Sequence, residues 1–276
     1  MSGVNEIKKI TSPQNSLIKE TARLLKKRQK SGEFLIEGIN LLEAALRPGS
    51  NAKVSKLFYT QEFVAREQEV FGVFIKEASS NGAEIFELST GAIERISDTS
   101  TPQGIAAVAT LEPSSLFSID PAKGPIVVAD GIQDPGNLGT IIRTADAASA
   151  AGVLLIDGIT CDPLNPKALR ASAGSVFNFP VISEKKEIAI AGLRSLGCTI
   201  AVSVPGGKTH YYDSPLSLPL AIVFGNEARG VSDEFMEAAD VSVSIPVKGG
   251  AESLSVSAAA AVLLYEALRQ GVTGGH

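Results

Sequence analysis

Three loops in the C-terminal half combine glycine with polar side chains. The first, residues 130–146 (DGIQDPGNLGTIIRTAD), joins a predicted buried strand to a helix, and the second, residues 224–234, holds the carboxylate of Glu227. The third, residues 245–267, leads from a glycine-bearing loop into a helix start with Ser253, Ser255 and Ser257. Glycine lets backbone approach a ligand closely, and helix starts present unpaired N–H groups. Such a helix start suits a carboxylate or the polar edge of a ligand.

The first loop also invites a dinucleotide-binding interpretation. Gly131, Gly136 and Gly139 form a glycine-rich turn, and Asp157 ends the next strand where a ribose-binding acid would lie. However, Asp134-Pro135 interrupts the turn and breaks the GxGxxG spacing. A dinucleotide-dependent oxidoreductase therefore remains the weaker hypothesis. Taken singly, each loop also fits an ordinary turn, helix cap or close helix contact.

Histidine and cysteine offer little material for catalysis or metal binding. The chain has two histidines, His210 and His276, and two distant cysteines, Cys161 and Cys198, which match no CxxC spacing. We therefore expect no disulfide framework, no zinc site and no other metal.

The elements that position the loops alternate regularly after residue 125. Near-continuous apolar strands between helices predict a mostly parallel sheet covered by helices on both faces, and ligands of such sheets bind at the carboxyl ends of the strands. The predicted strands are 126–130, 153–157, 198–204, 219–225 and 241–247. The predicted helices are 137–150, 167–177, 185–197, 231–240 and about 253–269.

Residues 1–112 predict a separate small α/β domain. Ser12-Pro13 is typical of a helix start, and further strands and helices alternate at 34–36, 40–46, 54–59, 62–81, 84–88 and 105–110. Residues 113–125, rich in Pro and Ser, predict a linker, which leaves 126–276 as the larger C-terminal domain.

Charge is distributed unevenly along the chain. The net charge is −5, but residues 1–30 carry eight Lys or Arg against two Glu, so this segment is +6 and the remainder is −11. The basic end is either a phosphate-contacting surface or the solvated face of a helix. The first thirty residues lack the apolar centre of a secretory signal, and no run is long enough to cross a bilayer. We therefore expect a soluble, cytoplasmic protein.

Taken in order, the three loops resemble the signature motifs of the SpoU family of RNA ribose methyltransferases, within the SPOUT superfamily. The first motif corresponds to Asp134-Pro135-Gly136-Asn137-Leu138-Gly139 with Arg143, and the second to Gly225-Asn226-Glu227-Ala228-Arg229-Gly230. The third corresponds to Ile245-Pro246 followed by Ser253-Leu254-Ser255-Val256-Ser257. Ser255 departs from the family, which usually has Asn at that position.

The N-terminal stretch resembles the RNA substrate-binding domain often joined to this family. The residues that carry this likeness are Ile10-Thr11-Ser12 with Asn15, Phe34-Leu35-Ile36-Glu37-Gly38, Ser97-Asp98-Thr99 and Thr101-Pro102-Gln103-Gly104. The resemblance implies that Asn15, Lys26, Lys27 and Arg28 bind RNA, together with Arg143 of the catalytic domain.

The resemblance implies S-adenosylmethionine as cofactor and a trefoil knot formed by the segments that hold the second and third motifs. Backbone around Gly225, Ile245 and Leu254 would hold the cofactor, helped by Val202 and Ser203. A guanidinium stays protonated throughout the physiological pH range, so a literal base role for the family's motif arginine is awkward. We instead expect Arg143 to hold the adjacent phosphate and stabilise the developing alkoxide.

The other catalytic residues implied by the resemblance support Arg143. Asn137 and Glu227 would orient Arg143 and its loop, although an ion pair of structural purpose is an alternative for Glu227. Proton removal would be shared by Ser253 or solvent. Ser255 would orient the loop or the Ser253 hydroxyl, and a plain helix N-terminal role is its alternative.

The implied function is 2′-O-methylation of structured RNA by a homodimer whose interface uses the first and last helices of the catalytic domain. Ribosomal RNA is the expected substrate, and transfer RNA is the alternative. A non-catalytic RNA-binding dimer is the rival from another class: Asn137, Arg143, Glu227 and Ser253 argue against it, while Ser255 keeps it open.

Overall fold

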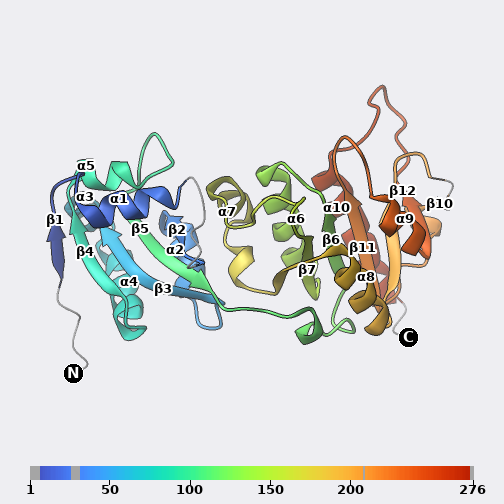
Figure 1. Cartoon of the computed structure of the whole chain (residues 1–276), viewed down its shortest axis with the longest axis horizontal. Helices are drawn as coiled ribbons and strands as arrows, with labels where there is room; N and C mark the ends of the chain where they lie inside the picture. The colour runs from blue at the N-terminus through green and yellow to red at the C-terminus, as the bar shows by residue number, and fades with distance from the viewer. Residues whose placement is uncertain (1–6, 26–31, 208, 274–276) are drawn as a thin grey trace. The chain divides into compact units, whose positions relative to one another are not determined.

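The computed structural model describes residues 7–25, 32–207 and 209–273 (Figure 1). For residues 272 and 273 it describes the backbone alone. The predicted RNA-binding residues Lys26, Lys27 and Arg28 lie outside the described residues. Internal contacts divide the chain into two compact units: Met1–Pro113 with Leu164–Asn178, and Ser114–Pro163 with Phe179–His276.

The first unit is built on a five-stranded mixed sheet in the order β1-β4-β3-β5-β2. The β1, β3 and β4 strands run parallel, whereas β5 pairs antiparallel with both β3 and β2. The strands are β1 (Lys8–Ile10), β2 (Phe34–Glu37), β3 (Ala52–Tyr59), β4 (Glu84–Leu88) and β5 (Ile105–Leu111). The helices are α1 (Ser16–Arg23), α2 (Ile39–Leu46), α3 (Gln61–Arg66), α4 (Gln68–Ser80) and α5 (Thr90–Arg95).

The start of α1 differs from the prediction. The Ser12 hydroxyl accepts from the Gln14 N–H at 3.2 Å within a turn, so Ser12-Pro13 lies ahead of the helix. The N-cap is Asn15, whose side chain accepts from the Leu17 N–H at 2.9 Å. An Asn side chain satisfies an orphan N–H of the first turn as well as Ser does.

The segment Leu164–Asn178 belongs to the first unit although the sequence analysis placed it within 126–276. It holds α7 (Pro166–Ser172) and the 3₁₀ turn η2 (Ser175–Phe177) in place of one continuous helix. The helix ends because Ala173 and Gly174 adopt left-handed conformations, with φ of 50° and 90°. A Cβ on Gly174 would lie 2.3 Å from the Ala44 Cβ, so the close approach to α2 requires glycine.

The second unit is built on a seven-stranded sheet in the order β10-β12-β9-β11-β6-β7-β8, and every pair in it is parallel. The strands are β6 (Ile126–Asp130), β7 (Gly152–Ile156), β8 (Val181–Glu184), β9 (Thr199–Ser203), β10 (Thr209–His210), β11 (Leu220–Gly225) and β12 (Val241–Ser244). The helices are α6 (Pro135–Ala147), α8 (Lys186–Ser195), α9 (Asp233–Ala238) and α10 (Val256–Thr273), with 3₁₀ turns η1 (Leu116–Ser118) and η3 (Tyr211–Asp213).

Helices cover both faces of this sheet, as predicted (Figure 1). Along β6 every residue is buried, and Ile126 and Val128 share one apolar cluster with Leu193 of α8 and Phe235 of α9. Because strand side chains alternate between faces, Val127 and Ala129 point to the opposite face. There α6 and α10 pack against each other, with α6 contacting β7 and α10 contacting β11. The strand sequences are continuous apolar runs because helices bury both faces of the sheet.

Within the described part of the chain, no helix has the length and apolar character needed to cross a bilayer.

Candidate active site

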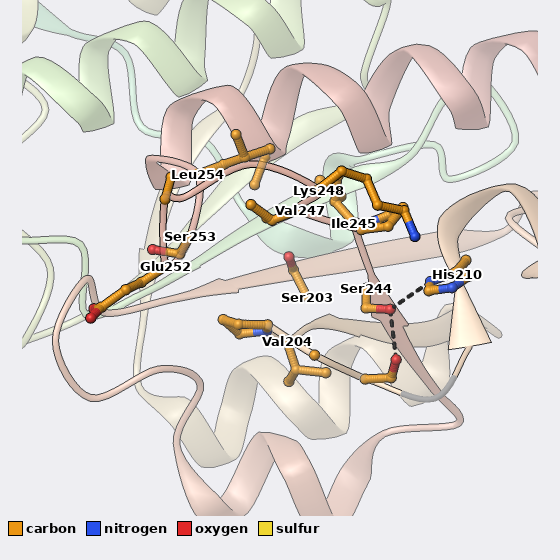
Figure 2. Close-up of a pocket in the computed structure, with 16 residues that line it drawn as sticks. Ser203, Val204, His210, Ser244, Ile245, Val247, Lys248, Glu252, Ser253 and Leu254 are labelled. Atoms are coloured by element: carbon orange, nitrogen blue, oxygen red, sulfur yellow. Dashed lines mark hydrogen bonds between the residues drawn. The ribbon is translucent and has the colours of Figure 1, made fainter.

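A pocket of about 440 Å³ lies beyond the carboxyl ends of β9 and β12 (Figure 2). Its walls come from the segment after β9, from β10 and from the loop between β12 and α10. The lining residues are Ser203, Val204, Pro205, Gly206, Gly207, His210, Ser244, Ile245, Pro246, Val247, Lys248, Ala251, Glu252, Ser253, Leu254 and Ala259. Its size is that of a small-molecule site, and its wall mixes apolar side chains with hydroxyls and backbone.

Three of the predicted cofactor-binding residues, Ser203, Ile245 and Leu254, line this pocket, and so does the predicted catalytic residue Ser253. Val202 does not, because its side chain is fully buried in the apolar cluster under α8 and α9. Within the described residues neither the Ser203 nor the Ser253 hydroxyl makes a hydrogen bond, so both remain available to a ligand.

Gly225 lies outside the pocket wall at the end of β11, and the second motif folds back tightly over it. Asn226 and Gly230 exchange backbone hydrogen bonds of 2.9 Å in each direction. A Cβ on Gly225 would lie 2.2 Å from the Gly230 carbonyl carbon. The structure therefore accounts for this glycine by the close approach of the motif's own backbone.

Asn226 joins the second motif to the first. Its side-chain oxygen accepts from the Ala228 and Arg229 N–H groups at 2.9 and 3.0 Å, and its amide nitrogen donates to the Gly131 carbonyl at 2.8 Å. The buried Asp130, which precedes Gly131, accepts from the Ser232 N–H at 2.7 Å. Sequence reasoning missed Asn226 as a positioning residue, because its partner lies 95 residues away along the chain.

Asn137 connects all three motifs. It lies in the first turn of α6, where Asp134 caps the helix by accepting from the Asn137 N–H at 2.9 Å and Pro135 follows the cap. The Asn137 amide nitrogen donates to a Glu227 carboxylate oxygen at 3.1 Å, and its amide oxygen accepts from the Ser257 hydroxyl at 3.1 Å. We call Asn137, Glu227 and Ser257 the motif junction. Both polar ends of the Asn137 side chain are thus occupied.

Arg143 is exposed on α6, and its side chain makes no hydrogen bond or ion pair within the described residues. Among the described residues, neither Asn137 nor Glu227 forms a hydrogen bond or an ion pair with Arg143, and the two side chains bond to each other instead. Arg143 lies six residues after Asn137. In a helix with 3.6 residues per turn, this separation points the two side chains about 120° apart around the helix axis. The guanidinium is therefore available to an anionic ligand, and the expectation that Asn137 and Glu227 orient it directly stays a prediction.

Ser255 caps α10. Its hydroxyl accepts from the Ala258 N–H at 3.2 Å, and its carbonyl accepts from the Ala259 N–H at 2.9 Å. The Ser255 hydroxyl also lies 3.3 Å from the hydroxyl of Ser257, a member of the motif junction. These bonds support the alternative that Ser255 acts as the N-cap of the helix. Ser255 also contacts the motif junction through Ser257.

A thiol lies close to the first two motifs. Burial raises the pKa of Cys161 from 9.0 to about 11, and the carboxylates of Asp134 and Glu227 add to the rise. The thiol therefore stays protonated near neutral pH and is a poor nucleophile. Among the described residues no cluster of three or more His, Cys, Asp or Glu could hold a metal ion.

In the first unit, the predicted RNA-binding residue Asn15 serves as the cap of α1. The Glu37 carboxylate gathers the 97–99 loop: it accepts from the Ser97 hydroxyl, from the Thr99 hydroxyl at 2.6 Å and from the Asp98 N–H at 3.0 Å. Glu37 thus joins two of the segments that carry the N-terminal resemblance, 34–38 and 97–99.

The fold and the site define an α/β protein with a small-molecule pocket at the carboxyl edge of a parallel sheet and three motifs tied together beside it. The family described as SpoU rRNA Methylase matches residues 124–265, and an MRM3-like substrate binding domain matches residues 15–107. The chain belongs to the SpoU rRNA Methylase family, which confirms the resemblance predicted from the motifs.

Individual relatives match over nearly the whole chain. A 23S rRNA (guanosine(2553)-2′-O)-methyltransferase of Bacillus subtilis is 35% identical, covering 94% of this chain and 98% of the relative. A 23S rRNA (uridine(2479)-2′-O)-methyltransferase of Streptomyces viridochromogenes is 29% identical, covering 90% and 86%. The crystal structure of an AdoMet-bound rRNA methyltransferase from Sinorhizobium meliloti superposes with a TM-score of 0.84 at 32% identity, covering 96% and 98%.

Proposed function

We propose that this chain transfers a methyl group from S-adenosylmethionine to the 2′-hydroxyl of a ribose in ribosomal RNA. The observation that carries the proposal is the motif junction: hydrogen bonds join the three motifs, and residues of the third motif also line a pocket of small-molecule size. The Bacillus subtilis and Streptomyces viridochromogenes relatives, which span most of the chain, are named as 23S rRNA 2′-O-methyltransferases, and a solved neighbour is described as bound to AdoMet.

The pocket suits S-adenosylmethionine in size and in chemistry. Ile245, Val247 and Leu254 offer apolar surface to a planar base, while the Ser203 and Ser253 hydroxyls offer polar contacts. Backbone between Val204 and Gly207 supplies further donors and acceptors. When bound, the cofactor supplies an electrophilic methyl group on a positively charged sulfonium, so the chain has to position and activate the ribose oxygen.

Arg143 is the residue proposed to act on the RNA. Its exposed guanidinium holds the phosphate next to the target ribose and stabilises negative charge on the 2′-oxygen as its proton leaves. The proton passes to solvent, directly or through the Ser253 hydroxyl. The motif junction keeps α6, and with it Arg143, in a fixed position relative to the pocket wall. Asn137, Glu227 and Ser255 therefore act as positioning residues.

The first unit is proposed to bind the RNA. The positive charge of the chain is concentrated in residues 1–30, and phosphate contacts supply much of the affinity for RNA. Replacing Lys26, Lys27 and Arg28 together by Gln is expected to lower RNA affinity at least tenfold in filter binding and to flatten its salt dependence. Binding of S-adenosylmethionine should not change. An unchanged salt slope would assign these residues to an ordinary solvated surface.

The trefoil knot and the homodimer belong to the same proposal. From β12, which pairs with β9, the third-motif loop leads to α10, and α10 packs against β11 and α6. On α10, Tyr265 and Leu268 are 51% and 37% exposed, which supports an interface formed by α6 and α10. Light scattering of the purified chain tests the dimer directly.

The decisive experiment is methyl transfer to RNA from cells that lack this protein. Labelled methyl groups should enter large-subunit ribosomal RNA at one site, and the product should resist alkaline cleavage there, because alkali requires a free 2′-hydroxyl. Transfer RNA serves as the competing substrate. Methylation of a base with a still-cleavable backbone would refute the ribose assignment, and absence of any transfer would favour a non-catalytic RNA-binding protein.

A further inference from the structure

A second pocket, of about 410 Å³, lies beyond the carboxyl ends of β6 and β11. Residues of the first and second motif loops supply most of its wall, and the starts of α8 and α9 complete it. The members of the motif junction do not line it, and the proposed function gives it no ligand. Its volume is that of a small-molecule site.

The wall of the second pocket is held in place by bonds within the protein. The Gly131 N–H donates to the Thr160 hydroxyl at 3.1 Å, and the Gly131 carbonyl accepts from the Asn226 amide nitrogen at 2.8 Å. The Thr160 hydroxyl in turn donates to the Ala129 carbonyl at 2.8 Å. The polar backbone of this wall is therefore already bonded, which leaves recognition to the side chains.

Asp130 is the buried polar side chain of the wall. It is 2% exposed, and its Oδ2 accepts from the Ser232 N–H at 2.7 Å. Its Oδ1 is buried and has no hydrogen-bond partner within the described residues. A buried acceptor without a donor costs free energy, and such groups are uncommon in folded proteins. Because Asp130 lines the pocket, a ligand in the pocket can supply the missing donor.

The other side chains restrict what that ligand is. Ile159 is 44% exposed and offers an apolar surface to a flat ring. Lys186 pairs with Glu234 at 3.0 Å, whereas the exposed Arg229 guanidinium makes no hydrogen bond or ion pair within the described residues. Asp233 adds a further carboxylate to the wall. The pocket thus combines acceptors for N–H groups, an apolar surface and an available cation, which together suit a nucleotide.

We propose that this pocket binds a nucleobase of the substrate RNA that carries an exocyclic amino group. The amino group donates to the Asp130 Oδ1, and Arg229 contacts the phosphate of the same nucleotide. Cytosine and adenine present an amino donor, whereas uracil has a carbonyl oxygen at the corresponding position and would set it against the carboxylate. Asp130 therefore selects against uracil.

The inference rests on the proposed function, because it takes RNA as the substrate. The cofactor pocket lies beyond β9 and β12, and the second pocket beyond β6 and β11. Strand β11 pairs with both β9 and β6, so the two pockets share one edge of the sheet. Neighbouring strands lie about 4.8 Å apart. A single RNA strand can therefore occupy the second pocket while it presents a ribose near the first.

Cytidine and uridine monophosphates are matched ligands for the test, because they differ in the amino or carbonyl group that faces Asp130. The amide NMR signals of Gly131 and Ser232 report on the wall of the pocket. Cytidine monophosphate should shift both signals, and uridine monophosphate should bind about fivefold more weakly, because it lacks the donor to the carboxylate. Equal affinities, or no shift with cytidine monophosphate, would overturn the proposal.

Asp130→Asn exchanges the acceptor for a donor at nearly constant shape. The Asn oxygen can keep the bond from the Ser232 N–H, and the amide nitrogen then takes the place of Oδ1. The preference should reverse in favour of uridine monophosphate. Circular dichroism checks that the variant folds. A folded Asp130→Asn protein that still prefers cytidine monophosphate would show that Asp130 only supports the Ser232 backbone, and the proposal would be wrong.

Arg229→Gln tests the phosphate contact without touching the buried carboxylate. Cytidine monophosphate should bind wild type several-fold more tightly than cytidine does, and the two ligands should bind Arg229→Gln alike. Lys185→Gln is the control, since it removes an exposed charge from a residue that does not line the pocket. An undiminished difference between the ligands in Arg229→Gln would contradict the proposal, even if Asp130→Asn does not fold.

The methyl-transfer assay separates this inference from the proposed function. If wild type methylates ribosomal RNA while cytidine monophosphate leaves the Gly131 and Ser232 signals unmoved, the inference fails and the proposed function stands. If no RNA is methylated while the two nucleotides are discriminated as described, the proposed function fails and the nucleotide specificity of the pocket stands. When both hold, Arg229→Gln should raise the KM for RNA and leave the affinity for S-adenosylmethionine unchanged.

Discussion

The motif junction and the pocket differ in whether their polar side chains have hydrogen-bond partners within the protein. At the junction, both ends of the Asn137 amide are bonded, to Glu227 and to Ser257. In the pocket, the Ser203 and Ser253 hydroxyls line the wall without a hydrogen-bond partner among the described residues, and on α6 the Arg143 guanidinium is in the same condition. The comparison separates residues that hold the site together from residues that are available to ligands. Motif membership alone does not make this distinction.

The largest effect should come from the exposed arginine. Arg143→Ala is expected to lower the single-turnover rate of methyl transfer at least a hundredfold, roughly 3 kcal/mol, because a charge-assisted contact to the transition state is lost. The affinity for S-adenosylmethionine in calorimetry should stay within a few-fold. Arg95→Ala, which removes one exposed charge from the first unit, is the control and should keep its rate. A parallel loss of cofactor affinity in Arg143→Ala would contradict its assignment to RNA.

A smaller effect is expected at the motif junction, where a pair of substitutions can swap the amide and the carboxylate between Asn137 and Glu227. Asn137→Asp places a carboxylate 3.1 Å from Glu227 and should slow transfer about tenfold, roughly 1.4 kcal/mol, while lowering the melting temperature. Adding Glu227→Gln supplies an amide donor to the new carboxylate and should restore most of the loss. Additive losses in the double variant would mean that the two side chains do not act through their mutual contact.

The smallest effect should occur at Ser255. Ser255→Val removes the cap of α10 and should lower the free energy of unfolding by about 1 kcal/mol. Ser255→Asn and Ser255→Asp can both cap the helix and should unfold close to wild type. Activity of Ser255→Asn should stay within about tenfold, with Ser255→Val losing more through the contact with Ser257. If Ser255→Val matches wild type in rate, the hydroxyl stabilises the helix and has no part in the chemistry.

Strand and helix types in the second unit could largely be predicted because burial on both faces leaves a strong sequence pattern. Strand β6 begins and ends at the predicted residues, Ile126 and Asp130. Strands β8 and β10 were not predicted, since four and two residues are too short to show periodicity. The cap at Asn15 was missed because several polar residues precede α1, and the choice among them depends on local turn geometry.

The site could be predicted as a set of motifs but not as a set of contacts. The family motifs that the three loops resemble implied Asn137, Arg143, Glu227 and Ser253 as site residues. They could not reveal that Glu227 pairs with Asn137 rather than with Arg143, because side-chain pairing depends on the helix face and on which strands are neighbours. Val202 shows the same limit: its position at a strand end indicated the pocket, but alternation along the strand directs its side chain into the core.

The motif junction also has a consequence for how the protein matures. Its two hydrogen bonds join residues 90 and 120 positions apart in sequence, in a unit whose sheet has only parallel pairs. Such non-local contacts form slowly, because the entropy of closing long loops has to be overcome first. The junction cannot exist until Ser257 has left the ribosome and α10 has docked on α6. A nascent or truncated chain therefore has motifs without a site, and catalytic competence is one of the last properties that the folding polypeptide acquires.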